Sequence, residues 1–185
     1  WLPTAVESSE QATAERQVEL VGTGPSPSDG DFRSSAYRLL DLIEGARHTI
    51  WIATYTLGSP SDLQLALRAA LDRGVRIRLL CDRAEDGDGN SNILDGWKTW
   101  LAEDLQHRIE FYSWPRELRS VNENGGIAKM HVKAVVIDRT KAIVTSANLT
   151  EEAHARNMEF GVVLTGGTTA RQIHDRLESM IAEEI

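Results

Sequence analysis

The sequence is short of the features that mark membrane, secreted or strongly polyanion-binding proteins. Its one cysteine, Cys81, ends an apolar run, so no disulfide forms within the chain and a reducing compartment is expected. No stretch of 18 apolar residues occurs, and the start has no basic or apolar leader pattern. Lys and Arg number 20 against 28 Asp and Glu, a net charge of -8 that gives no long-range attraction to phosphate backbones. We expect a soluble, cytoplasmic protein that holds any polyanion through a local basic patch.

An internal repeat is also missing, and the length allows one sizeable core. With 185 residues and 41% apolar content, a single compact domain is the expected organisation. Residues 1–30 are rich in Ser, Pro, Gly and Glu, which predicts an N-terminal tail or linker with one short strand at 19–22. Residues 31–185 are predicted to form the domain.

Within 31–185, β-branched and aromatic runs alternate with helical patterns. Strands are predicted at 49–57, 75–81, 108–114, 130–137, 142–145 and 157–165, and helices at 32–44, 61–73, 93–105 and 168–183. The β-α-β-α-β order of the first half favours right-handed crossovers between parallel strands. The predicted fold class is α/β, with a mixed, largely parallel β-sheet flanked by helices on both faces.

Two polar residues interrupt the apolar run Met130–Ile137. In a strand, His131 and Lys133 share one face with Val135 and Ile137. A lysine on a buried strand is costly unless it is paired or lines a cavity, and the alternative is an edge strand with one wet end. Asp138 heads the following turn, where we expect its carboxylate to accept backbone N–H groups.

The next predicted strand ends in the segment Thr145–Asn148. Ser146 and Asn148 are two residues apart, so both side chains are expected to point the same way at the mouth of the sheet, where open α/β folds bind their ligands.

These residues resemble the phospholipase D superfamily. His131, Lys133 and Asp138 match its H-x-K-x4-D motif, while Ser146 and Asn148 lie where its G-S-x-N segment follows. Thr145 replaces the glycine of that segment, which puts the tightness of the turn in question. The β-α-β pattern is similar to the family's fold as well, so the resemblance covers about 32–185.

The resemblance implies a metal-independent phosphodiesterase without a cofactor. Neutral His131 would attack phosphorus and form a phosphohistidine. Lys133 and Asn148 would hold the non-bridging oxygens, with a further hydrogen bond from Ser146. Glu159, which resembles the family's downstream acidic residue, would accept from the other ring nitrogen of His131.

One loop resembles a metal site. Residues 86–92, DGDGNSN, resemble the start of a calcium-binding loop, but Ser91 stands where glycine is needed and Trp97 where a bidentate glutamate is needed. We therefore expect a solvated loop and no metal.

The family's mechanism uses two histidines, and long members contain two copies of the motif. This chain contains one copy, because His48, His107, His154 and His174 lie in other contexts and are expected to be surface or helix residues. The resemblance therefore implies a homodimer whose shared cleft contains both copies of His131, as in small single-motif members.

The substrate class is open at this stage. The loop 113–129 contains Trp114, Arg116, Arg119 and Lys129, which predicts a cationic, stacking lining for nucleic acid; the alternative is a plain surface loop. A nuclease acting on DNA or RNA is the leading hypothesis, because the chain is small and lacks a membrane-binding segment. The alternatives are a phospholipid phosphodiesterase and a non-catalytic interaction subunit.

Two segments narrow the resemblance further. The run SANLT at 146–150 and the following N-x-E-x-G-V at 157–162 are similar to the phospholipase-D-like component of the bacterial DISARM anti-phage system. This similarity implies a role in defence against foreign DNA, with other defence proteins as partners.

Overall fold

The three-dimensional structure is a computed structural model. It describes residues 16–24, 33–55, 61–81, 107–150 and 157–182. Its strands are β1 (Gln17–Thr23), β2 (Arg33–Ser34), β3 (Thr49–Thr54), β4 (Arg76–Cys81), β5 (Ile109–Ser113), β6 (Ala134–Ile137), β7 (Lys141–Thr145) and β8 (Glu159–Thr165). Its helices are α1 (Ser35–Glu44), α2 (Ser61–Asp72), the short 3-10 helix η1 (Arg116–Leu118) and α6 (Thr169–Ala182). The predicted helix at 93–105 lies outside the described residues.

The strands form one sheet in the order β2-β1-β8-β7-β6-β3-β4-β5. Strands β3, β4 and β5 run parallel, as the alternating strand and helix patterns predicted. Strands β3, β6, β7, β8 and β1 pair antiparallel in turn. A tight turn reverses the chain between β6 and β7, whereas β3 with β6 and β1 with β8 are pairs of strands distant in sequence. The predicted α/β class with a mixed sheet is confirmed, although parallel pairing is limited to β3–β5 and to the β1–β2 pair.

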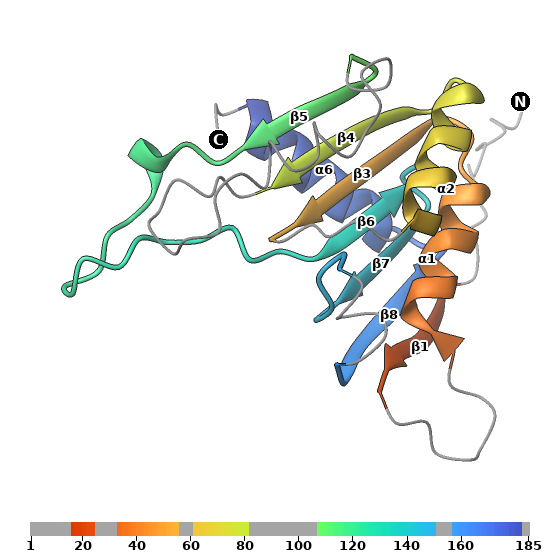
Figure 1. Ribbon diagram of the computed structural model, residues 1–185, viewed down its shortest axis with the longest axis horizontal. Helices are drawn as coiled ribbons and strands as arrows, with labels where there is room; N and C mark the ends of the chain where they lie inside the picture. Colours follow the sequence, from red (N-terminus) through yellow and green to blue (C-terminus); the bar gives the residue numbers. More distant parts are fainter. Residues whose placement is uncertain (1–15, 25–32, 56–60, 82–106, 151–156, 183–185) are drawn as a thin grey trace, which may run out of the picture.

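Helices cover both faces of the sheet, as predicted: α1 and α2 lie against one face and α6 against the other (Figure 1). On the first face, the apolar stripe of α1 buries Leu39, Leu42 and Ile43 against strand residues such as Ile50 and Val135. Tyr37 of the same helix does not belong to this stripe, because its side chain is 73% exposed.

The second core lies under α6. Leu177 of α6 packs over Trp51, Val136 and Leu164 of the sheet. Helix α1 connects β2 to β3, α2 connects β3 to β4, and α6 follows β8. The two faces of the sheet are therefore covered by segments distant in sequence.

Strand β1 changes the picture of the N-terminal region. It pairs with β8 along its whole length, from Gln17 opposite Thr165 to Thr23 opposite Glu159, and Val21 is fully buried. The short strand predicted at 19–22 is therefore present, but it belongs to the sheet and not to a tail. The structure does not describe residues 1–15 and 25–32, so the predicted domain boundary at residue 30 stays a prediction.

Candidate active site

Several strand ends meet at one end of the sheet. Strand β3 finishes at Thr54 beside the start of β6, because Ala53 is the register partner of Ala134. Strand β7 finishes at the same end, and β8 begins there, since Thr145 pairs with Gly161. Polar residues that follow or precede these strands are thereby brought together.

The two polar residues of the 130–137 segment, His131 and Lys133, are in contact. The ammonium nitrogen of Lys133 lies 3.1 Å from Nδ1 and 3.3 Å from Nε2 of the His131 ring. His131 is exposed, whereas Lys133 is 8% exposed. The predicted strand 130–137 is shorter than expected, because β6 starts at Ala134; the Lys133 carbonyl still accepts from the Thr145 N–H at 3.1 Å.

Burial makes the charged form of Lys133 less favourable than in water. Burial lowers the pKa of its ammonium below the usual value, and the negative charge of Glu159 opposes that shift. The arrangement places an imidazole that is reachable from solvent beside a buried amine.

Lys133→Met is expected to abolish activity without lowering thermal stability. A lysine pKa that is lower in the folded than in the unfolded state means that the charged form destabilises the fold at pH 7. This penalty decreases as pH rises above the folded pKa and is gone only above the unfolded pKa of 10.5. The melting temperature should stay unchanged or rise by up to about 4 °C. Differential scanning fluorimetry with the exposed Lys141→Met as control checks this, and a clear fall in melting temperature would assign Lys133 a structural role.

Ser146 and Glu159 form a second polar pair at this end. The Ser146 hydroxyl donates to Glu159 Oε2 and accepts from the Phe160 N–H at 3.1 Å. Within the described part of the chain, Glu159 has no hydrogen bond to His131, so the predicted histidine-orienting contact is not formed. Glu159 instead fixes Ser146 and acts on Lys133 through its charge.

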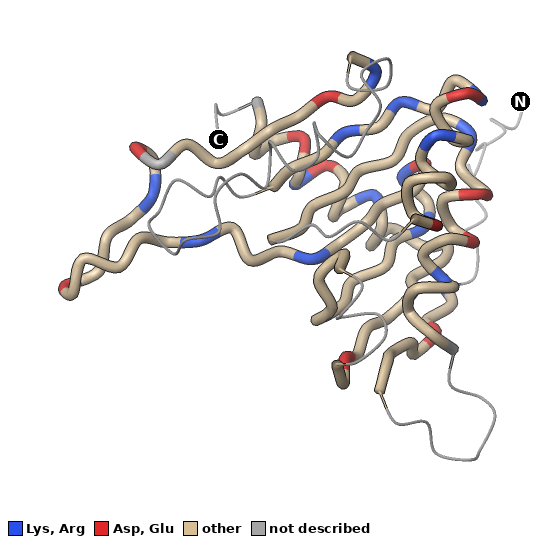
Figure 2. The backbone as a smooth tube through the Cα atoms, in the orientation of Figure 1, with Lys and Arg blue, Asp and Glu red and all other residues tan. Residues whose placement is uncertain are grey.

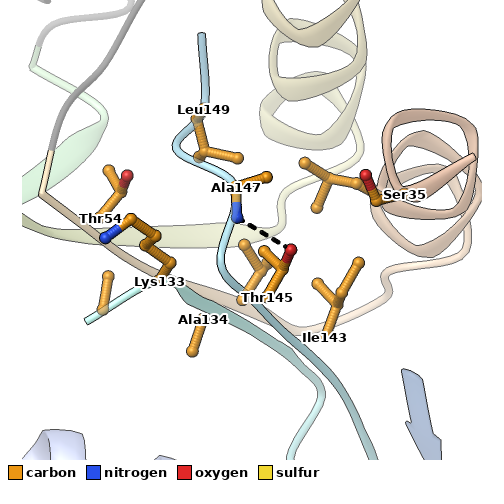
Figure 3. Close-up of a pocket in the computed structure, with 11 residues that line it drawn as sticks. Ser35, Thr54, Lys133, Ala134, Ile143, Thr145, Ala147 and Leu149 are labelled. Atoms are coloured by element: carbon orange, nitrogen blue, oxygen red, sulfur yellow. Dashed lines mark hydrogen bonds between the residues drawn. The ribbon is translucent and has the colours of Figure 1, made fainter. Parts of the chain in front are cut away.

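Thr145 explains why the family's glycine is dispensable here. Its hydroxyl accepts from the Ala147 N–H at 3.1 Å and donates to the Phe160 carbonyl at 3.2 Å, so the side chain closes the turn (Figure 3). The glycine is on the neighbouring strand: a Cβ on Gly161 would lie 2.8 Å from Thr145 Cβ and from the Val144 carbonyl oxygen. Gly161 thus makes room for Thr145.

Asn148 follows β7 by three residues and its Oδ1 is buried with no hydrogen-bond partner among the described residues. An unpaired buried acceptor is costly, so this amide is positioned for a donor that the described residues do not supply. No hydrogen bond joins it to His131 or Lys133 within that part of the chain, and its predicted contact with non-bridging oxygens remains a prediction.

Asp138 is at the other end of β6, remote from His131. Its carboxylate accepts the backbone N–H groups of Arg47, His48 and Thr49, each at 2.8 Å. The expected structural task is present, but the donors belong to the α1–β3 connection and not to Asp138's own turn. The Asp138 carboxylate thus ties β6 to the start of β3, and a catalytic role for this motif residue stays a prediction.

Asp138→Asn is expected to lower the free energy of unfolding by about 1–3 kcal/mol at pH 7. The amide keeps the left-handed backbone (φ 50°) but loses charge-assisted acceptance. These N–H bonds outweigh burial and lower the carboxyl pKa, so their contribution is present above the unfolded pKa near 4 and is lost as pH falls through the folded value. Urea unfolding at pH 7 and pH 3 measures this.

The matched control is Asp72→Asn, whose carboxylate makes an exposed ion pair with Arg108 and is expected to matter by under about 1 kcal/mol. Equal stability loss for Asp138→Asn at both pH values would contradict the linkage.

The predicted basic and aromatic lining is only partly formed. Arg119 is 6% exposed, and its guanidinium donates to the Trp114 carbonyl and lies 5.5 Å from the Trp114 ring, so it holds the loop and does not face substrate. The indole Nε1 of Trp114 is buried without a partner among the described residues. The Arg116 side chain lies outside the described residues.

Tyr55, which directly follows β3, was missed by the sequence analysis. Its ring centroid lies 4.9 Å from that of His131, with the planes tilted by 45°, and 5.8 Å from the Lys133 ammonium. Lys129 donates to its hydroxyl at 3.3 Å. Figure 2 shows basic positions along the segment that leads into β6, at the end of the sheet where β3 finishes. The sequence feature that could have pointed to Tyr55 is its place as an aromatic residue near the carboxyl end of a predicted parallel strand.

The nearest cavity is too small to hold a substrate. Its volume is about 10 Å³, and Lys133 and Thr54 lie on one side of it with Ser35 on the other (Figure 3). That is the space of about one water molecule. The cavity beside Lys133 therefore does not enclose a ligand-sized space.

Metal ligands are not grouped in the described part of the chain, where no cluster of three or more His, Cys, Asp or Glu residues occurs. The loop 86–92 lies outside the described residues, so the prediction that it is solvated stays untested.

Comparison with known proteins agrees with this geometry. A family model described as "Cardiolipin synthase, PLD-like domain" matches residues 39–181. The chain is 26% identical over 151 residues to the DISARM protein DrmC of Bacillus paralicheniformis, covering 80% of this chain and 57% of that protein. It is 27% identical over 168 residues to the probable cardiolipin synthase YwiE of Bacillus subtilis, covering 89% and 29%. The chain thus spans little more than half of the first relative and under a third of the second.

Solved structures share the fold. NucT from Helicobacter pylori superposes with a TM-score of 0.69 at 17% identity, covering 91% of this chain and 97% of that one. The phospholipase D family member Nuc from Salmonella typhimurium gives 0.62 at 23% identity, covering 89% and 93%. Both are close in length to this chain, unlike the synthase.

Proposed function

Since the chain belongs to the phospholipase D superfamily, we propose that it is a phosphodiesterase that cleaves nucleic acid without a metal ion, with His131 as the nucleophile. One observation supports this most strongly: the exposed imidazole of His131 is in contact with the buried Lys133 amine, 3.1 Å apart. Nucleophilic displacement at a phosphodiester requires this pairing of a lone pair with a cation for the equatorial oxygens.

The proposed reaction has two steps. A ring nitrogen of His131 attacks phosphorus, the N–P bond forms and the bond to the leaving oxygen breaks, and that oxygen takes a proton from a second acid. Water then attacks phosphorus and gives its proton to the group that served as the acid in the first step, the N–P bond breaks and the imidazole is restored. Lys133 and Asn148 hold the non-bridging oxygens in both steps. The Ser146 hydroxyl donates to Glu159 in the free site, so it has to turn away from that carboxylate before it can add a donor.

The contact between Lys133 and His131 has to open for the first step. In the free site the ammonium occupies a ring lone pair. A bound phosphate competes for the same ammonium, because a charged oxygen is the stronger acceptor. Substrate binding thereby releases the nucleophile, so a ring lone pair is free to attack only when a phosphate is in place.

The second acid is proposed to be His131 of a partner subunit. The α6 face of the sheet carries four exposed apolar side chains, Val18 and Leu20 of β1, Val144 of β7 and Phe160 of β8; we call these four the apolar strip. Their exposed fractions are 56%, 55%, 37% and 56%. Cross-strand register aligns Leu20 and Val144 with opposite sides of Val162, so the strip is continuous. Exposed apolar strips of this kind mark protein contacts, so the proposed partner subunit is expected to bind there.

The natural role is proposed to be anti-phage defence, acting with other proteins. The similarity to the DISARM protein DrmC supports this role.

The synthase relatives favour one second candidate, a phospholipid phosphodiesterase. Among the described residues, no helix has the length and apolar character needed to cross a bilayer. The discriminating experiment offers labelled DNA, labelled RNA and phosphatidylglycerol vesicles to the same protein in EDTA. Cleavage of nucleic acid with intact vesicles supports the nuclease, and head-group release with intact nucleic acid supports the lipid enzyme.

A further inference from the structure

Tyr55 and Lys129 form a pair of hydrogen-bond donors beside the nucleophile. Lys129 donates to the Tyr55 hydroxyl oxygen at 3.3 Å, while its ammonium lies 5.8 Å from the ring centroid. Because the hydroxyl projects from the ring edge, an ammonium at these two distances lies close to the C–O axis and not over the ring face. The Lys129 charge is therefore placed at the hydroxyl end of the ring.

The phenol leaves one donor directed away from this contact. Its oxygen accepts from Lys129, and an ammonium cannot accept the O–H hydrogen in return. Among the residues that the structure describes, no acceptor takes that hydrogen. Tyr55 is half-buried and Lys129 is exposed, so a ligand can reach both. An O–H donor next to an ammonium is a recognition pair for an anionic oxygen.

This pair is separate from the groups that bind the reacting phosphorus. Lys133 is held at the His131 ring nitrogens, and the two aromatic rings lie 4.9 Å apart. The Tyr55 ring thus contacts the nucleophile, while its hydroxyl end carries the second cation. Two neighbouring cations suit a ligand with more than one phosphate. A single nucleic-acid strand presents a series of phosphates, whereas a phospholipid diester such as phosphatidylglycerol presents one.

We propose that Tyr55 and Lys129 form a second anion subsite, which binds the phosphate next to the one attacked by His131. The proposal rests on the proposed nuclease function and makes it more specific. A neighbouring phosphate held there aligns the strand along the site, so that a substrate with two phosphates is cleaved more efficiently than one with a single phosphodiester.

The test compares a dinucleotide, which has one phosphodiester, with a trinucleotide, which has two. In the wild-type protein the second phosphate should raise kcat/KM by about tenfold, the effect of one charge-assisted contact. Tyr55→Phe, which keeps the ring against His131, and Lys129→Met should each remove most of this gain. Lys141→Met, an exposed lysine at the opposite end of β7, is the matched control and should retain the gain.

A binding measurement separates the outcomes. With His131→Ala protein and a fluorescent single-stranded oligonucleotide, adding Lys129→Met should lower the slope of log affinity against log salt by about 0.7. Retention of both the length gain and the slope in Lys129→Met would overturn the subsite while leaving the nuclease intact. Equal losses on both substrates would overturn it too, in favour of a role at the scissile phosphate. A wild-type protein that neither binds nor cleaves nucleic acid would refute the nuclease function itself.

Discussion

Replacement of His131 by alanine is expected to lower cleavage of DNA or RNA by at least about 10⁴-fold, with no loss of folding. The exposed imidazole lies at the surface of the site and, within the described ranges, its ring contacts Tyr55 and Lys133 without joining the buried core, so the fold is not expected to depend on it. Wild-type cleavage should continue unchanged in excess EDTA, because Lys133 supplies the positive charge that a metal provides in other nucleases. Cleavage of fluorescent oligonucleotides measures both effects.

The matched control is His107→Ala. His107 is exposed in the turn before β5, at the end of the sheet opposite the candidate site, and its loss should leave the rate unchanged. Activity that disappears in EDTA and returns with a divalent ion would contradict the metal-independent mechanism. Full activity in His131→Ala would remove its role as nucleophile, and an undiminished anti-phage effect from that variant would favour the non-catalytic interaction subunit.

Charging the apolar strip is expected to separate the subunits and to abolish activity together. In Leu20→Asp, the carboxylate would have to lose its hydration at the proposed interface, which is unfavourable without a partner. Sedimentation velocity should show a dimer for the wild-type protein and a monomer for the variant. Specific activity should fall by at least about 10²-fold, because the monomer lacks the second histidine that protonates the leaving oxygen.

Leu65→Asp is the corresponding control, since Leu65 is 64% exposed on α2, on the other face of the sheet. It should remain dimeric and active. A monomeric Leu20→Asp protein with full activity would contradict a shared cleft, as would a monomeric wild-type enzyme.

The fold was largely predictable because its elements have strong local patterns. The helix at 61–73 was recognisable from Ser61 and Asp62 at its start and from Gly74 at its end, and Gly74 adopts a φ of 83° after α2. The parallel order of β3, β4 and β5 followed from the alternating strand and helix patterns. Strand β1 was underestimated because its pairing partner, β8, is about 140 residues away in sequence, and only that pairing buries Val21.

The site was predictable where spacing along one segment determines position. His131 and Lys133 share a side because they are two residues apart, and the contact between them follows. Residues joined across strands were not predictable in this way. Glu159 reaches Ser146 rather than His131, Arg119 turns back onto its own loop, and Tyr55 enters the site only because β3 pairs with β6.

Capture of the covalent intermediate tests the mechanism most directly. The protein is mixed with end-labelled oligonucleotide in EDTA, quenched in alkali, where a phosphoramidate survives, and digested for mass spectrometry. We expect a nucleotide adduct on the peptide that contains His131, formed and consumed at the rate of turnover, released by acid and missing from His131→Ala. Efficient cleavage with no adduct at any time, or with the adduct on another residue, would contradict His131 as the nucleophile.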